Sequence, residues 1–461
     1  MKQNAAPNRT LRENKMLNDP ISRIVPEMAI PTIIAFLINS IYSLADTYFV
    51  SGLGTNATAA VSVNAALDQI IMMVGAMMAV GANSFVARLL GAGDKERADE
   101  VLSTAFFLVL GAGLVFGVLG SVFVEPLVEL MGATDTCREY AIDYATYVLL
   151  AAPFMATSFV LNQCLRAEGS AMRSMFGMGL GGVLNCILDP IVISGLGMGV
   201  LGASVATAIS KVVSFAVLLS PYLAGHSVLR LSVRCVRVKW SILGEIISVG
   251  MPSMLRSLLA VLTGVLLNRI AGEISDSLMA AIGVATKIMM FPFSIVLGFG
   301  SGFQPVAGFN WGARRFDRVR ECFRYSSRMA LWGSVAMALV LGVLAGPISG
   351  LFSKNDGELL RRSALCIQLQ CVALPIHAWV AVVNMLCAGL GYGGLAFLLA
   401  TARQGTCFLP ILLPMTLLMG EMGVVSIQAV ADVLTLLLGI PICRVVIGRI
   451  RKAETDSIRI E

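Results

Sequence analysis

Four polar residues stand in long apolar stretches of the sequence, and together they could bind a cation: Asp46, Asn185, Asp189 and Thr207. Their carboxylate, amide and hydroxyl oxygens are hard ligands that suit a small hard cation such as sodium. Alternatively, two carboxylates held close together in a medium of low dielectric would retain a proton near neutral pH. An ionisable residue deep in a membrane helix costs roughly 2.5–3.5 kcal/mol, so it marks a functional position by default. A purely structural role, hydrogen bonding between helices, is the alternative.

Further polar residues lie near these four and are possible modulators of the site. Asn39 and Tyr42 share a helix face with Asp46, because they precede it by seven and four residues. Asp68 is another acid in an apolar stretch, and Lys211 lies one helical turn beyond the threonine. An ammonium group beside the carboxylates would act as a resident cation, which weakens sodium binding and favours a proton cycle. Lys211 could equally extend toward water.

The elements that position these residues are membrane-spanning helices. Of the 461 residues, 57% are hydrophobic and only 13% are charged, whereas soluble domains carry roughly a quarter charged residues. Apolar runs of about 20 residues, enough to cross a bilayer, recur along the chain. Each run must be a helix, because lipid offers the backbone no hydrogen-bond partner. We therefore predict an all-α polytopic membrane protein with twelve spans, at 27–50, 57–80, 98–122, 139–162, 172–194, 199–223, 244–271, 278–301, 319–344, 363–388, 394–418 and 423–447.

The distribution of charge predicts the orientation of these spans. Alternate loops are rich in Lys and Arg, and such loops stay on the cytoplasmic side. We expect a multi-pass protein of the cell (inner or plasma) membrane with both termini in the cytoplasm and no cleavable signal peptide. The net charge of +6 follows from this loop asymmetry, so no nucleic-acid partner is expected.

Other classes of protein fit the sequence poorly. The ten Cys show no ligand-like spacing, so we expect no structural metal and no cofactor other than H+ or Na+ as a coupling ion. An intramembrane transferase would need an acidic pair motif or a catalytic His and Ser set, and a channel would need a repeated filter loop. Neither pattern is present. We predict a monomer that is not an enzyme.

The chain contains an internal repeat at an offset of 221 residues. Pro31 aligns with Pro252, and Gly91 aligns with Gly312. Pro153 meets Pro375 at an offset one residue longer. Because the register barely drifts over six predicted spans, the pattern indicates duplication.

The repeat predicts the domain organisation. An even number of spans in each copy gives parallel repeats, two six-helix bundles related by a pseudo-two-fold axis along the membrane normal. We predict an N-lobe at 27–223 and a C-lobe at 244–447. The cytoplasmic segments are then 1–26, an inter-lobe loop at 224–243 that would act as a natural hinge, and a tail at 448–461.

Four stretches carry a resemblance to a known family, and they occur in order on this duplicated frame. Residues 42–47 read Tyr-Ser-Leu-Ala-Asp-Thr and residues 91–94 read Gly-Ala-Gly-Asp. Residues 184–190 read Leu-Asn-Cys-Ile-Leu-Asp-Pro, and residues 202–207 read Gly-Ala-Ser-Val-Ala-Thr. The chain resembles the multidrug and toxic compound extrusion (MATE) family, and within it the DinF-like branch, over essentially its whole length.

This resemblance implies a cation-coupled antiporter that uses H+ or Na+ to export amphipathic, mostly cationic drugs or metabolites by alternating access. It implies small amphipathic substrates and membrane lipids as partners, and it places the cation site on the four N-lobe residues. Some relatives also carry C-lobe carboxylates, but the matching neighbourhoods here contain Ala260 and Trp379. We therefore expect coupling in the N-lobe alone. A flippase for lipid-linked or anionic lipid precursors is the alternative.

The C-lobe differs from the N-lobe in charge. It lacks acids at the matching positions and instead carries basic residues in or near its spans, among them Arg256, Lys287 and Arg403. These residues could line a cavity or bind anionic headgroups. With many Met in the apolar runs, a pliable cavity wall is expected. The candidates for the substrate cavity are Asn64, Met77, Arg256 and Lys287.

Overall fold

The computed structural model describes residues 11–352 and 357–460, and these form helices joined by short loops, without strands. Part of the predicted N-terminal segment, residues 1–10, lies outside the described residues. Two short π-helices, η1 and η3, and one 3-10 helix, η2, accompany the α-helices. The elements are α1 (Leu11–Asn18), α2 (Ile21–Ser51), α3 (Thr55–Ala92), α4 (Lys95–Val122), α5 (Val124–Leu130), α6 (Arg138–Ala167), α7 (Ala171–Asp189), η1 (Pro190–Gly195), α8 (Gly199–Leu223), η2 (Val233–Cys235), α9 (Trp240–Ile274), α10 (Asp276–Gly312), α11 (Phe316–Phe352), α12 (Gly357–Gly389), α13 (Gly393–Thr401), η3 (Ala402–Thr406), α14 (Leu409–Met419) and α15 (Glu421–Ile460).

Twelve membrane-spanning segments are present in the described residues, so the predicted number is confirmed. Most spans are longer than predicted, because helices such as α3, with 38 residues, extend beyond the apolar run into the polar flanks. The eleventh span is composite: α13, η3 and α14 follow one another over Gly393–Met419. Hydropathy alone did not reveal the π-helical turn inside it.

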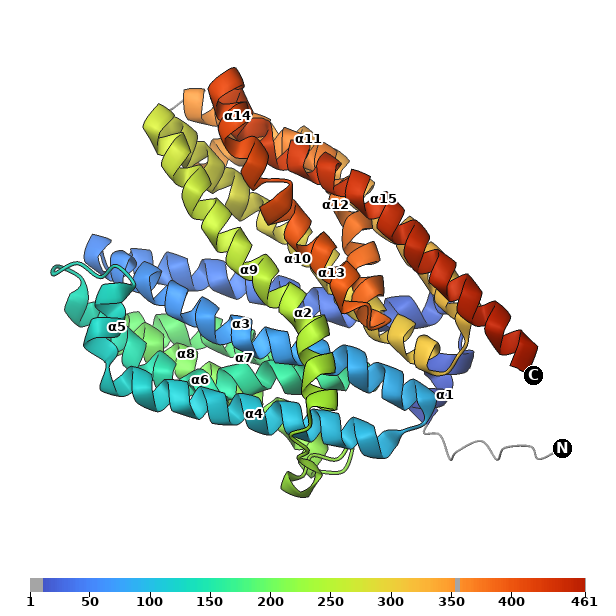
Figure 1. The fold of residues 1–461 in the computed structure, drawn as a ribbon. Coiled ribbons are helices and arrows are strands. Elements are labelled where there is room, and N and C mark those ends of the chain that lie inside the picture. Colours follow the sequence, from blue (N-terminus) through green and yellow to red (C-terminus); the bar gives the residue numbers. More distant parts are fainter. Residues whose placement is uncertain (1–10, 353–356, 461) are drawn as a thin grey trace.

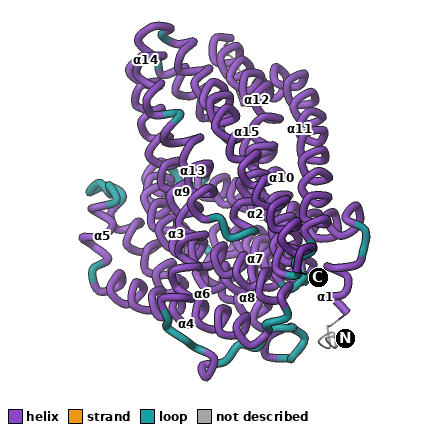
Figure 2. The backbone as a smooth tube through the Cα atoms, turned by 45° about the vertical axis from the view of Figure 1, so that its right-hand side comes forward, coloured by secondary structure: helices purple, strands orange, loops and turns teal. Residues whose placement is uncertain are grey.

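The helices form two groups that approach each other at one end (Figure 1). Helices α2 to α8 make up one group, and α9 to α15 make up the other. Helix α1 and the C-terminal end of α15 lie at the end where the groups meet, which we call the end with the termini, and the groups spread apart toward the end that carries α5 and α14 (Figures 1 and 2). We call these groups the N-lobe and the C-lobe. Their limits at 27–223 and 244–447 stay a prediction.

Glycines make the first contact between the lobes possible, along α3 and α9. A Cβ on Gly250 would lie 1.9 Å from the carbonyl oxygen of Met77, and a Cβ on Gly81 would lie 2.0 Å from that of Ile246. No side chain fits into either space. Because small residues let helix backbones touch in a membrane, this contact is one of close backbone packing.

A matching contact joins α2 and α10. A Cβ on Gly302 would lie 2.5 Å from the Cα of Ala29, and a Cβ on Gly298 would lie 2.7 Å from the Cα of Ile33. Gly302 stands 221 positions after Gly81, so the repeat offset read from the sequence relates the two contacts. The lobes therefore meet through two pseudo-equivalent glycine contacts.

Polar contacts strengthen the same end of the interface. The Oγ of Ser84 on α3 donates to the carbonyl oxygen of Ala388 on α12. Nη2 of Arg88 donates to Oε1 of Glu245 at 2.6 Å, which joins α3 to α9. The end of the molecule that carries the termini is thus closed by both backbone packing and ion pairing.

The inter-lobe loop is tied to the N-lobe through Glu168, which follows α6. Its carboxylate accepts hydrogen bonds from Ser227 Oγ at 2.5 Å and from the backbone N–H of Val228 at 2.8 Å and of Leu229 at 3.4 Å. It also pairs with Arg12 of α1 at 3.1 Å. The Glu168 side chain is fully buried, so these partners compensate its lost hydration.

Side chains of α4 hold the rest of the same loop. Asp99 Oδ1 accepts from the backbone N–H of Arg230 at 2.8 Å, and Thr104 Oγ1 accepts from that of Arg237 at 2.9 Å. The loop from the end of α8 to Arg237 is therefore attached to the N-lobe rather than suspended between the lobes.

Replacement of Glu168 by Ala is expected to lower stability by about 3 kcal/mol, because it leaves several buried donors and Arg12 without their partner. Thermal unfolding in detergent should show a lower midpoint, and trypsin should cleave the loop at Arg230 and Arg234 faster. Glu125→Ala serves as the control, since the Glu125 side chain is 64% exposed. Equal midpoints for the two variants would contradict the anchoring role.

Candidate functional site

The four predicted cation-site residues converge in the N-lobe. Asp46 lies on α2, Asn185 and Asp189 lie at the end of α7, and Thr207 lies on α8. Nδ2 of Asn185 donates to Oγ1 of Thr207 at 3.2 Å. Asp189 is close enough to Asp46 for their charges to interact. The helix changes from α to π immediately after Asp189, at Pro190, as expected where a proline interrupts backbone hydrogen bonding.

The site is rich in buried oxygens that lack a hydrogen-bond partner. They are Oδ1 of Asp46, Oδ1 of Asn185 and both carboxylate oxygens of Asp189. Buried polar atoms rarely remain unsatisfied, so a cluster of them points to a ligand. Because all four atoms are acceptors, they would receive a proton, a cation or a hydrogen-bond donor such as water.

Lys211 and Asp68 extend this cluster. The Lys211 ammonium lies 4.8 Å from the centre of the Tyr42 ring, and it interacts electrostatically with Asp68 and Asp46. Asp68 on α3 contributes a further buried oxygen, Oδ1, without a hydrogen-bond partner. Tyr42, Asp68 and Lys211, predicted as possible modulators, therefore lie in the same cluster as Asp46, and a lysine stands among the acids.

Tyr144 on α6 is a member of the cluster that sequence reasoning missed. It is buried, and it lies next to Thr207 and near Asp46 and Asp68. A Tyr in a membrane span carries little signal, because Tyr is common near both membrane interfaces. Its position one to two turns inside α6 was the available clue.

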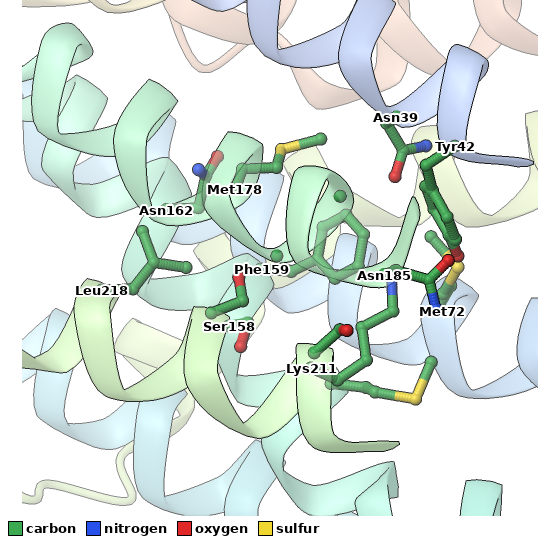
Figure 3. Close-up of a pocket in the computed structure, with 15 residues that line it drawn as sticks. Asn39, Tyr42, Met72, Ser158, Phe159, Asn162, Met178, Asn185, Lys211 and Leu218 are labelled. Atoms are coloured by element: carbon green, nitrogen blue, oxygen red, sulfur yellow. The ribbon is translucent and has the colours of Figure 1, made fainter. Parts of the chain in front are cut away.

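A cavity of about 50 Å³ opens beside this cluster. Figure 3 shows Tyr42 and Asn185 on one side of it and Asn162 and Leu218 on the other. A single water needs roughly 10–15 Å³ on this measure, so a few waters fit. Pockets for drug-sized molecules are typically 300–1,000 Å³, so the cavity is of a size for ions and water rather than for a substrate.

The other predicted residues occupy different places. Asn39 lines the same cavity. Asn64 is buried between α3 and α6, where its Nδ2 donates to the carbonyl oxygens of Ala60 and Ala141. Met77 lies at the contact between α3 and α9. Lys287 on α10 is exposed.

The C-lobe holds a buried acid that sequence reasoning overlooked, Asp432 on α15. It pairs with Arg403 of η3 through two bonds, at 2.6 Å to Oδ1 and 3.3 Å to Oδ2. Asp432 stands inside an apolar span, so the rule that identified the N-lobe acids also applied to it. Arg256, a predicted cavity residue, is half-buried nearby on α9 and is close enough to Arg403 for their charges to repel.

We next consider whether side chains of the described residues could form a metal site. There, no three side chains drawn from His, Cys, Asp and Glu come together in a way that could hold a metal ion. Any cation in the N-lobe would depend on the amide and hydroxyl oxygens of Asn185 and Thr207 as well as on the carboxylates.

Comparison with known proteins identifies the family. The MatE family model matches residues 31–191 and again residues 252–413. Its two matches begin 221 residues apart, one in each half, as the repeat requires. The chain belongs to the MATE family. The predicted family is confirmed, whereas the DinF-like branch stays a prediction.

Curated MATE relatives resemble the chain over most of its length. The multidrug export protein MepA of Staphylococcus aureus (strain MSSA476) is 26% identical over 419 residues, which cover 90% of this chain and 91% of MepA. An FAD transporter of Shewanella oneidensis is 30% identical over 370 residues, covering 78% of this chain and 81% of the relative.

Solved MATE structures share the fold. One, described as the outward-facing conformation of a multidrug resistance MATE family transporter, has a TM-score of 0.91 at 26% identity and covers 96% of this chain and all of that one. A further solved structure with this fold is described as a MOP superfamily transporter from Pyrococcus furiosus whose binding pocket of reverse polarity suggests a different function. It has a TM-score of 0.89 at 26% identity and covers 96% of this chain and 99% of that one. MATE proteins are membrane transporters rather than enzymes, and so is this multi-pass chain.

Proposed function

We propose that this MATE transporter exports small amphipathic molecules in exchange for a cation that binds in the N-lobe. The observation that carries the proposal is the cluster of buried acceptor oxygens on Asp46, Asn185 and Asp189, none of which has a hydrogen-bond partner. A cation or proton that enters and leaves this cluster would change the charge of the N-lobe, and such a change can drive a transport cycle.

The arrangement of the lobes supports alternating access. The interface is closed at the end with the termini, and the lobes spread at the other end. In this state the cation site lies on the spread side, because Asp46 is near the end of α2 and Asp189 is at the end of α7. With both termini in the cytoplasm, as the charged loops predict, this would be the outward-facing state. The monomeric state and this orientation remain part of the proposal.

The names of the relatives support small aromatic or amphipathic substrates. MepA is named for multidrug export, and the Shewanella protein is named for FAD. The alternative, a flippase for lipid-linked precursors, is not favoured, because one relative is named for multidrug export and the other for FAD transport, and neither for a lipid. The test is transport into or out of proteoliposomes under separately imposed proton and sodium gradients, which must each be compared with no gradient.

The position of Lys211 favours the proton as the coupling ion. A sodium ion bound among Asp46 and Asp68 would be repelled by the ammonium group, whereas a proton neutralises a carboxylate without adding a separate cation. The small volume of the adjoining cavity, about 50 Å³, also suits proton transfer through a few water molecules.

Lys211→Gln is therefore expected to raise the affinity for sodium by about tenfold, the effect of roughly 1.4 kcal/mol of repulsion removed. In proteoliposomes, a pH gradient alone should drive wild-type efflux of ethidium, and the variant should gain a response to a sodium gradient. Arg269→Gln is the control, because the Arg269 side chain is 80% exposed. Wild-type efflux that follows sodium and ignores pH would return the cluster to a sodium site.

A further inference from the structure

The C-lobe carries a counterpart of the N-lobe cavity with different charges. Four residues that line the N-lobe cavity have equivalents at the repeat offset of 221 or 222 positions that cluster in the C-lobe. In this correspondence Met72 matches Phe293, Met155 matches His377, Gly181 matches Arg403 and Lys211 matches Asp432. A lysine among acids in one lobe is thus replaced by an acid among arginines in the other.

The described contacts confirm that these C-lobe residues form one group. The Arg403 guanidinium lies 4.7 Å from the centre of the Phe293 ring, in a cation–π arrangement, and pairs with Asp432 on its other side. The Phe293 and His377 rings meet edge to face with their centres 5.2 Å apart. The group therefore combines a guanidinium with an aromatic surface.

Arg256 gives this group an excess of positive charge. It is half-buried, its Nη2 donates to Ser253 Oγ at 3.2 Å, and it forms no ion pair with any described carboxylate. Asp432 is held by Arg403, so it neutralises that guanidinium and leaves the charge of Arg256 uncompensated. A half-buried cation without a counterion is costly, so an anion at this position would be stabilised.

The group lies just beyond the last close contacts between the lobes. Arg256 stands six residues past Gly250, about 9 Å farther along α9, in the direction in which the lobes spread. Phe293 immediately precedes Ser294, whose Oγ is 2.7 Å from Oγ of Ser40 on α2 across the interface. The group therefore lies next to the interface between the lobes, on the side toward which they spread.

We propose that Arg256 and Arg403 form a subsite for the anionic group of an amphipathic substrate whose ring system packs against Phe293 and His377. Guanidinium groups bind phosphate and carboxylate through paired, charge-assisted hydrogen bonds. The inference rests on the proposed export function and specifies aromatic organic anions as one class of its substrates. The N-lobe takes the coupling cation, so substrate and cation bind to opposite charges in opposite lobes.

Asp432 lowers the affinity of the subsite for anions. Its carboxylate neutralises Arg403 and competes with the incoming anion for the same donors. Asp432→Asn should therefore strengthen anion binding, whereas Arg256→Gln should weaken it. Opposite responses of two neighbouring variants separate an electrostatic subsite from a general loss of folding.

The test compares two flavins that differ in one phosphate. The full-length chain in phosphatidylcholine nanodiscs, without any gradient, is titrated with flavin mononucleotide and with riboflavin, and binding is followed by flavin fluorescence anisotropy. Wild type should bind the mononucleotide about tenfold more tightly, one charge-assisted contact. Arg256→Gln should abolish this preference and Asp432→Asn should increase it, while Arg269→Gln on the same helix should leave it unchanged.

Equal binding of the two flavins by wild type would overturn the anion subsite. That result is distinct from failure of the proposed function, which would appear as absent efflux of both ethidium and flavin mononucleotide from wild-type proteoliposomes under either gradient. A second arm replaces a third of the phosphatidylcholine with phosphatidylglycerol. If phosphatidylglycerol competes with the mononucleotide in wild type but not in Arg256→Gln, a lipid phosphate also occupies the subsite. If the competition persists in Arg256→Gln, the mononucleotide binds elsewhere, and the assignment is overturned.

Discussion

Asp46→Asn is expected to abolish concentrative export while the protein remains folded in the membrane. The substitution keeps the shape of the side chain but removes the group that would take up a proton or a cation. Because Asp46 Oδ1 is buried without a hydrogen-bond partner, replacement of the carboxylate by an amide breaks no hydrogen bond at that atom, so the fold should survive. Ethidium efflux driven by a gradient should fall to the level of empty proteoliposomes.

Asp189→Asn should give the same loss, and the double variant should be no worse than either single one. Residues that act in one step show effects that do not add, in contrast to distant, independent sites. Asp135→Asn, a change of an exposed acid in the loop after α5, is the control and should retain efflux. Substantial export by a well-expressed Asp46→Asn variant would remove Asp46 from the coupling site.

Gly250→Leu is expected to abolish export for a different reason, because it prevents the lobes from closing at the end with the termini. Its Cβ would fall 1.9 Å from the Met77 carbonyl oxygen, which is backbone and cannot move aside without separating α3 from α9. Loss of this contact should also release the bond between Ser84 and α12 a few residues farther along α3.

Gly264→Leu on the same helix is a matched control, since a Cβ at Gly264 meets no atom within 4 Å. Efflux of ethidium should vanish in Gly250→Leu and persist in Gly264→Leu. Hydrogen exchange measured by mass spectrometry should rise around residues 77–88 of α3 in the first variant only. If residues 77–88 of Gly250→Leu exchange at the same rate as in the wild type, the interface accommodates the leucine side chain.

The sequence predicted the fold well, because each membrane span must satisfy its own backbone and be apolar over about 20 residues. The duplication was also readable, since paired residues such as Gly91 and Gly312 keep their spacing. The composite eleventh span was not readable, because a π-helical turn at Arg403 leaves no trace in hydropathy.

Individual site residues were predictable where a charge stands in an apolar span, as with Asp46 and Asp189. Their partners were not, because the rotation of each helix about its axis decides which faces meet. Lys211 was expected near Asp189 or Asp46, and the structure adds Asp68 from a third helix. Arg403 and Asp432 stand 29 positions apart in the sequence and lie on different elements, and the glycine contacts join the two halves of the chain. Such long-range pairings arise only from the packed structure.

Because the inter-lobe loop is attached to α4, the start of α9 is held close to the N-lobe by a short segment of chain. The last bond from this loop to the N-lobe is that of Arg237, and α9 starts at Trp240. Three steps of extended chain span at most about 11 Å, so the foot of α9 stays close to the N-lobe in every state of the cycle. The helix has 35 residues and is therefore about 52 Å long. A rotation about the start of α9 moves its far end most, and it moves Arg256, about 24 Å along the helix, by roughly half as much.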